Sequence, residues 1–199
     1  MRVKTGGLFA AIAMMSVLTG CAGGLGKATP PDTYGLSEAP QVSGQAARNR
    51  QILITEPSAL KALDSEQIVI RPSASSIQYL ANSKWSDRLP KIVQDKLVQA
   101  FENTGRVGGV GRPGDGLAID FKVLTAIRAF EIKADAGEQA VVELSAKVLN
   151  DRNGVVIASK VFRATSRVSG SGNAAYVQSL DRAFEQVVEE MVAWTLARI

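Results

Sequence analysis

Regular alternation of apolar and polar residues in the C-terminal half is the sequence feature that most constrains the fold. From Ala140 to Val148 every second residue is apolar, and Glu143, Ser145 and Lys147 lie between them. A period of two puts all of these apolar side chains on one face of a β-strand. The stretch therefore predicts a strand with one buried face.

Two neighbouring segments repeat this pattern. The segment that begins at Leu117 alternates as far as Ile127, but Phe130 falls on the opposite parity, which predicts a β-bulge or a twist between them. The turn-forming sequence Asn150–Gly154 precedes the third segment, residues 155–168. The three segments predict an antiparallel meander with one buried face.

Two further stretches have the periodicity of an α-helix. In the first, apolar residues recur every three or four positions from Leu89 until the chain reaches Gly105, and Asp87 is placed to cap the start. The second begins near Asn173, and its apolar stripe extends to Leu196. Two amphipathic helices on one face of a mainly antiparallel sheet form a two-layer α+β sandwich, which is the fold that we predict.

Short apolar runs add strands to this sheet. The runs Ile52–Ile54 and Ile68–Ile70 are each followed within three residues by proline, and Ile77 and Tyr79 come after a serine-rich turn. These runs predict buried strands and a hairpin.

The segment 105–116 is rich in glycine and contains a G-x-G-x-x-G pattern at Gly109, Gly111 and Gly114. A dinucleotide site needs a strand before this pattern and a helix after it, so that the pyrophosphate meets the helix N-terminus. Here a predicted helix precedes the pattern, a predicted strand follows it, and Pro113 lies inside it. We interpret the segment as a mobile loop.

The chain of 199 residues has no histidine and a single cysteine, Cys21. It therefore has no disulfide within the chain, lacks the usual ligands of zinc, copper and haem, and cannot form a Ser-His or Cys-His catalytic arrangement. We predict no catalytic residue, no metal site and no cofactor, so the protein is not expected to be an enzyme.

Three residue patterns could be read as catalytic, but each has a simpler explanation. Ser58–Lys61 fits S-x-x-K, but the partner motifs of the penicillin-recognising enzymes are missing downstream. Asp115 and Asp120 flank a junction between loop and strand, and Glu189 and Glu190 lie on the solvated face of a predicted helix. We assign none of these residues to catalysis.

Cys21 ends the run Leu18–Cys21, which has the form of a bacterial lipobox. Before it lie Arg2, Lys4 and an apolar stretch at 8–18, which together have the shape of an export signal. The apolar stretch is shorter than the roughly 18 residues that a membrane-spanning helix needs. We therefore predict cleavage before Cys21 and its conversion to a diacylglyceryl thioether, with fatty acyl groups such as palmitate on the new amino terminus.

These features divide the chain into three parts. Residues 1–20 are the lipoprotein signal peptide, 21–33 are the lipidated N-terminus and a flexible Gly/Pro-rich tether, and 34–199 are a single α+β domain. Removal of the signal takes away Arg2 and Lys4 but no acid, so the formal charge falls from +4 to about +2. A charge this small gives no indication of nucleic-acid binding.

The residues between 56 and 90 resemble a known family. The segments Glu56–Leu60, Leu63–Ser65, Ile68–Arg71, Ile77–Tyr79 and Trp85–Pro90 are similar to those of the ABC-type transport auxiliary lipoproteins, the PqiC-like family. The order of the helices and strands that follow is similar too, and the lipobox in front adds to the resemblance. The chain departs from the family at Ser86, where alanine is common, and in its longer glycine-rich segment.

The resemblance implies a non-catalytic accessory subunit of a lipid transport system. In such a system an ABC transporter in the inner membrane works with an MCE-domain protein that crosses the periplasm. The lipoprotein is anchored by its lipid to the periplasmic face of the outer membrane, where it docks the MCE-domain protein. Ala22 fits this location, because aspartate after the lipidated cysteine is the usual signal for retention in the inner membrane.

Two alternatives stay open at this point. The domain can be a lipid-carrying binding module that holds a phospholipid acyl chain between sheet and helices, or a structural lipoprotein that assists another envelope machine. Whether the chain forms a homo-oligomer, such as a ring around a tubular partner, also stays open.

Overall fold

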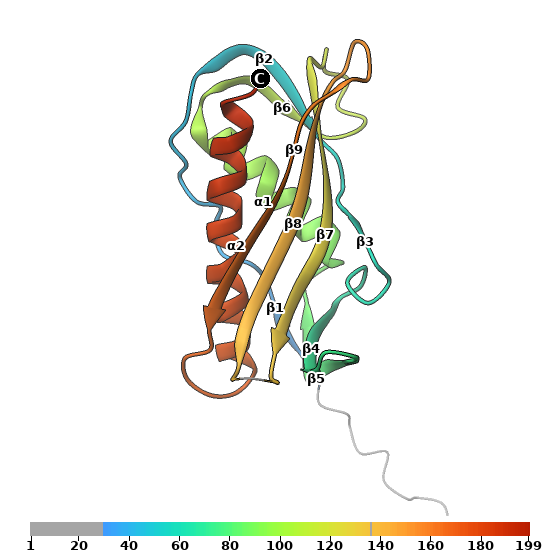
Figure 1. The fold of residues 1–199 in the computed structure, drawn as a ribbon, viewed down its shortest axis with the longest axis vertical. Coiled ribbons are helices and arrows are strands. Elements are labelled where there is room, and N and C mark those ends of the chain that lie inside the picture. The colour runs from blue at the N-terminus through green and yellow to red at the C-terminus, as the bar shows by residue number, and fades with distance from the viewer. Residues whose placement is uncertain (1–29, 136) are drawn as a thin grey trace, which may run out of the picture. The chain divides into compact units, whose positions relative to one another are not determined.

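A computed structural model of the protein describes residues 30–135 and 137–199 (Figure 1). The predicted signal peptide and Cys21 lie outside the described residues. In chain order the elements are β1 (Asp32–Tyr34), β2 (Ala47–Ile54), β3 (Ser58–Ala59), β4 (Gln67–Ser73), β5 (Ser76–Trp85), α1 (Leu89–Thr104), β6 (Val107–Gly111), β7 (Phe121–Lys133), β8 (Gln139–Asn150), β9 (Val156–Arg167) and α2 (Asn173–Leu196). β1 thus begins inside the segment 21–33 that composition marks as a tether.

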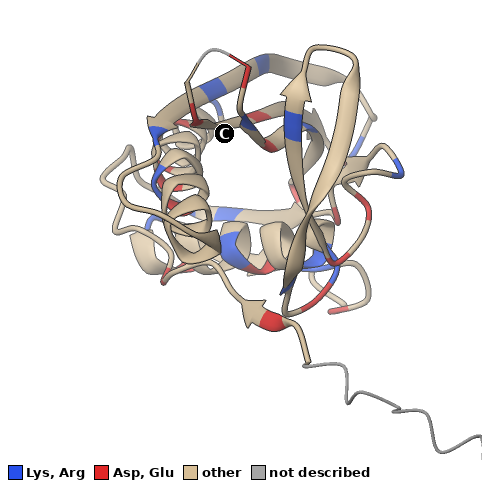
Figure 2. Cartoon of the chain, turned by 90° about the horizontal axis from the view of Figure 1, so that it is seen from below, with Lys and Arg blue, Asp and Glu red and all other residues tan. Residues whose placement is uncertain are grey.

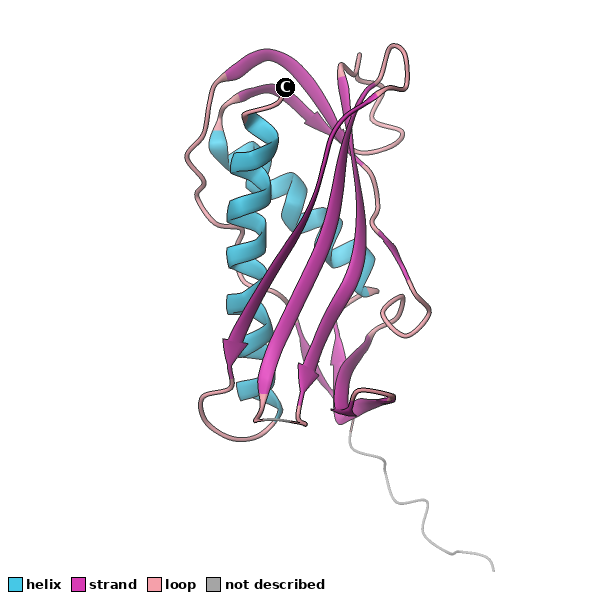
Figure 3. Cartoon of the chain, viewed as in Figure 1, coloured by secondary structure: helices cyan, strands magenta, loops and turns pink. Residues whose placement is uncertain are grey.

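The two helices lie on the same face of one sheet (Figures 1 and 3). α2 packs against β7, β8 and β9, and α1 packs against β2 and β6. The predicted two-layer α+β sandwich is therefore confirmed. The largest side chains that are fully buried between the layers are Trp85, Phe101, Phe130, Phe162, Ile52, Ile54, Ile68, Leu89, Leu97, Ile132, Leu144 and Leu180.

β7 is the strand on which the rest of the sheet is assembled. One edge of it pairs with β8 in antiparallel fashion over nearly its whole length. Along the other edge three short strands pair with it in parallel, first β2, then β3, then β4. The β4–β5 hairpin forms as the sequence indicates, but the run Ile52–Ile54 joins β7 in a parallel pairing that the sequence did not indicate.

The change of parity in β7 is a β-bulge, as predicted. The β7–β8 register shifts between Ile127 and Ala129, so Arg128 is the extra residue. Ile127 before the bulge and Phe130 after it are both buried in the core. The bulge therefore lets both halves of one long strand direct apolar side chains at the helices.

The prediction of a mobile loop at 105–116 is wrong for its first half. Val107–Gly111 form β6, which pairs in parallel with β2. A Cβ atom at Gly108 would come within 2.4 Å of the main-chain oxygen of Arg48, so only glycine permits this approach of the two strands. Gly105 adopts a left-handed conformation (φ 58°) and ends α1, where the sequence predicts the helix to stop.

We expect Gly108→Ala to lower the free energy of unfolding by about 2 kcal/mol, because the added methyl group meets backbone that cannot move aside easily. Gly109→Ala is the matched control, since its Cβ would lie 3.5 Å from the Gln51 side chain, an ordinary contact. Urea denaturation of both variants measures the difference. Equal losses in the two would show that β2 and β6 are not held this closely.

A second prediction concerns Thr125, whose hydroxyl is buried and has no hydrogen-bond partner among the described residues. Thr125→Val keeps the shape and removes the unpaired group, so we expect unfolding to cost about 1 kcal/mol more. In the control Thr195→Val, a hydroxyl that donates to Met191 O at 2.8 Å is lost, and stability is expected to fall. Thermal unfolding measures both. A destabilised Thr125→Val would contradict the assignment.

Candidate functional site

The S-x-x-K pattern lies at the surface, and Asp120 makes structural contacts. Ser58 lies in β3 and Lys61 in the turn after it, and both are exposed. Asp120 accepts a hydrogen bond from Gln51 N at 3.1 Å and pairs with Arg152 at 3.3 Å. Asp120 therefore ties the start of β7 to β2 and to the turn after β8.

Asp115 and Glu190 also make structural contacts. Asp115 accepts a hydrogen bond from Arg112 N at 2.6 Å, and Glu190 pairs with Lys160 at 2.5 Å. Within residues 30–135 and 137–199, no three acidic or cysteine side chains are grouped so that they could hold a metal ion. In the same residues no helix has the length and apolar character needed to cross a membrane.

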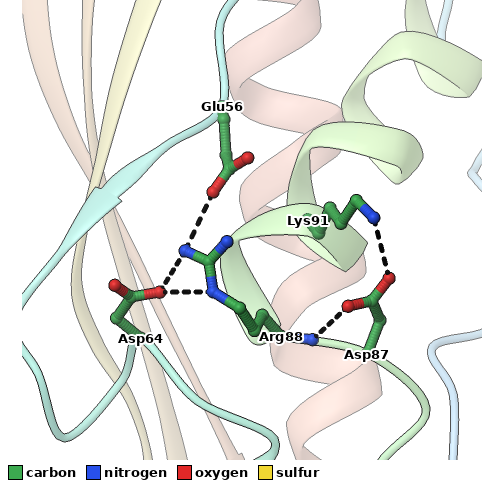
Figure 4. Close-up of polar contacts among 5 residues, drawn as sticks. All are labelled: Glu56, Asp64, Asp87, Arg88 and Lys91. Atoms are coloured by element: carbon green, nitrogen blue, oxygen red, sulfur yellow. Dashed lines mark hydrogen bonds and ion pairs between the residues drawn. The ribbon is translucent and has the colours of Figure 1, made fainter.

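A cluster of charged side chains at the start of α1 is the most connected polar feature in the segment that carries the family resemblance. We call it the Arg88 junction; it consists of Glu56, Asp64, Asp87, Arg88 and Lys91 (Figure 4). The Arg88 guanidinium lies between two carboxylates, with Nε 2.9 Å from Asp64 Oδ1 and Nη2 3.0 Å from Glu56 Oε1. The side chain thereby links the segment after β2 and the segment before β4 to the first turn of α1.

Backbone hydrogen bonds reinforce the Arg88 junction. Leu89 N donates to Ser65 O at 3.0 Å, and Trp85 N donates to Glu66 O at 2.7 Å. The Trp85 side chain is 1% exposed, and its ring meets Phe130 edge-on with the centroids 5.7 Å apart. The residues that carry the family resemblance thus converge in space, and Trp85 has a packing role rather than a role in stacking on a ligand.

The electrostatics of the Arg88 junction follow from these contacts. The pKa of Asp87 is lowered, mainly because the backbone N–H of Arg88 donates to its carboxylate, with a smaller contribution from Lys91. The pKa of Arg88 is raised, first by its hydrogen bond to Asp64 and then by the charges of Asp64 and Glu56. The N-cap position of α1 is occupied by Arg88, so the prediction of Asp87 as the cap is wrong by one residue. Asp87 instead fixes the residue that enters the helix.

A groove of about 560 Å³ lies beside the Arg88 junction. Its walls include Leu36, Lys91, Asp95 and Arg112, so it lies between the exposed face of α1, the segment after β1 and the segment after β6. Arg112 and Asp95 form an ion pair of 2.6 Å in its wall. Basic and acidic residues are also interspersed over the part of the chain that the structure describes (Figure 2). The groove offers paired charges and hydrogen-bonding groups, which suits contact with another polar surface.

Comparison with known proteins identifies the family. The family model described as ABC-type transport auxiliary lipoprotein component matches residues 34–192. The chain belongs to this family. The match extends from β1 into α2, and it confirms the resemblance seen in residues 56–90.

Individual relatives agree with this assignment. A protein of Bradyrhizobium diazoefficiens is 31% identical over 169 residues, which are 84% of this chain and 45% of that protein. The chain thus spans about half the length of this curated relative. The crystal structure of XCC0632 from Xanthomonas campestris, of the DUF330 family, matches with a TM-score of 0.71 at 29% identity over 83% of this chain and 95% of that one.

A more distant structure has the same fold. It is the PelC dodecamer from Paraburkholderia phytofirmans, which matches with a TM-score of 0.50 at 13% identity and covers 82% of this chain and 96% of that one. The fold assigned from sequence is thus shared by solved proteins. The family to which the chain belongs is described as the auxiliary lipoprotein component of ABC-type transport.

We expect Arg88→Met to lower the melting temperature, because it removes both ion pairs of Arg88 while keeping most of the side-chain length. The difference from wild type should shrink in about 1 M NaCl, where surface charges are screened. The control Lys84→Met loses a single exposed pair, with Glu66 at 2.9 Å, and should have a smaller effect. Equal effects of the two variants would contradict a special role for the Arg88 junction.

Proposed function

We propose that this chain is a non-catalytic, lipid-anchored subunit of an intermembrane lipid transport system of the ABC transporter and MCE type. In this proposal it docks the periplasm-spanning MCE-domain protein at the outer membrane. The observation that carries the proposal is membership of the auxiliary lipoprotein family over residues 34–192. The lipobox that ends at Cys21 supplies the means of anchoring.

Lipidation of Cys21 gives an attachment that does not depend on a membrane-spanning helix. Each buried methylene contributes about 0.8 kcal/mol, so several acyl chains make the attachment effectively permanent. A flexible tether of about a dozen residues has an r.m.s. reach of roughly 20 Å, which lets the domain stand clear of the lipid surface. Ala22 after the lipidated cysteine supports release to the outer membrane.

The packing of the domain favours docking over the carriage of lipid. A carrier would hold an acyl chain between the sheet and the helices, where Phe101, Phe130 and Phe162 are fully buried. These side chains occupy the space that the acyl chain would need. The PelC relative is a dodecamer, and we include a homo-oligomer of this chain in the proposal.

The test is affinity purification of the full-length, tagged lipoprotein from detergent-solubilised envelopes of the cell that produces it. We expect an MCE-domain protein to be enriched at least tenfold over a purification with an unrelated outer-membrane lipoprotein carrying the same tag. We also expect deletion of the gene to alter outer-membrane lipid asymmetry. Recovery of a different envelope machine without any MCE-domain protein would favour the structural-lipoprotein alternative and contradict the proposal.

A further inference from the structure

β9 is a long strand at the edge of the sheet. Among the described residues its 12 residues pair with β8 and with no other strand. Three apolar side chains in its first half are exposed to solvent, Val156 at 48%, Ile157 at 43% and Val161 at 42%. An edge of this kind is a template for pairing with another polypeptide.

The two halves of β9 differ in how the edge is protected. At the end of the strand Arg182 of α2 donates to the main-chain oxygen of Arg167 at 3.2 Å and to Ser166 Oγ at 3.2 Å. In the first half, Val156–Val161, the one charged side chain is Lys160, which is held by Glu190 on α2. Proline, one usual protection of an edge, is thus missing where the apolar side chains are exposed, and the single charge is held in an ion pair with α2.

The main-chain groups and apolar side chains of the β9 edge indicate the kind of ligand that it binds. An edge strand presents a row of N–H and C=O groups, and only the main chain of another polypeptide supplies matching groups at the same spacing. The exposed β-branched side chains beside this row select an apolar segment, because opposite residues on paired strands pack against each other.

A second copy of this chain does not supply such a segment readily. The other edge strands of the described sheet are β1, with the sequence Asp-Thr-Tyr, β3, with Ser-Ala, and β6, with three glycines in five residues, so none offers a row of apolar side chains. Two β9 strands related by a twofold axis can form a ladder only in antiparallel fashion, because like groups would oppose each other in a parallel pairing. The β1 ends of the two copies would then point in opposite directions, which does not suit two anchors in one membrane.

The position of the edge suits a partner that arrives from across the periplasm. β1, the first strand after the tether, lies at one end of the domain, and the β8–β9 turn lies at the other (Figure 1). β7 connects these ends with 13 residues, about 43 Å at 3.3 Å per residue. The apolar start of β9 thus lies at the end of the domain opposite β1, the strand that follows the tether in the sequence.

We propose that the first half of the β9 edge, Val156–Val161, binds an extended apolar segment of the MCE-domain partner, which joins the sheet as an additional strand. This inference rests on the proposed function. It names the surface of the domain through which docking occurs.

Site-specific photocrosslinking in intact cells tests the assignment. A benzoylphenylalanine at position 161 of the full-length lipoprotein should form an adduct with the MCE-domain protein. The same residue at position 77 is the control, since Ile77 and Val161 are exposed to the same extent, 43% and 42%. An adduct at 161 with a second copy of this chain, or adducts with the MCE-domain protein in equal amounts at both positions, would overturn the proposal.

A charge placed on the edge gives an independent readout. Val161→Lys should reduce recovery of the MCE-domain protein at least tenfold, whereas Ile77→Lys should change it less than twofold, with both variants melting like the wild type. If wild type and Val161→Lys recover the partner equally, the edge assignment fails while the proposed function stands. If the wild-type chain recovers no MCE-domain protein, the proposed function fails and the edge assignment fails with it.

Discussion

The pairing of both edges of β7 is the constraint on which the rest of the structure depends. A single strand of 13 residues holds β8 along one edge and β2, β3 and β4 in succession along the other. The bulge at Arg128 is essential to this arrangement, because without it Ile127 and Phe130 would face opposite sides of the sheet. One apolar face, continuous along the strand, then becomes available for the helices to cover.

The surfaces of the domain follow from this arrangement. Since β2, β3 and β4 line up along β7, the loops between them meet the start of α1, and Arg88 ties those loops together through Glu56 and Asp64. Since β8 and β9 extend the meander on the other edge, β9 is left as the terminal strand. The charged junction is thus a structural tie, whereas the outer edge of β9 is left without a paired strand among the described residues.

Local signals in the sequence predicted much of this fold. The features that they did not predict depend on pairing between segments that are far apart in the sequence. Alternation and helical periodicity predicted β8, the bulge in β7, and both helices with their ends near Gly105 and Leu196. The parallel pairing of Ile52–Ile54 with β7 has no local signal, because the partners are far apart in sequence. The glycines of β6 indicated a loop, since composition does not distinguish flexibility from the close approach of two strands at Gly108. The sequence did not reveal that β9 lies at the edge of the sheet. Alternation indicates which face of a strand is buried, but it does not indicate which strands lie beside it.

Anchoring through Cys21 is the claim on which the functional account depends, and the chain's only cysteine makes it directly testable. The most direct measurement is the distribution of the full-length protein and its Cys21→Ala variant between outer-membrane, inner-membrane and soluble fractions, with circular dichroism to confirm that the variant folds. The account predicts that the wild-type protein is in the outer membrane and that the folded variant is absent from it. A Cys21→Ala variant that is found in the outer membrane in wild-type amounts would contradict the account.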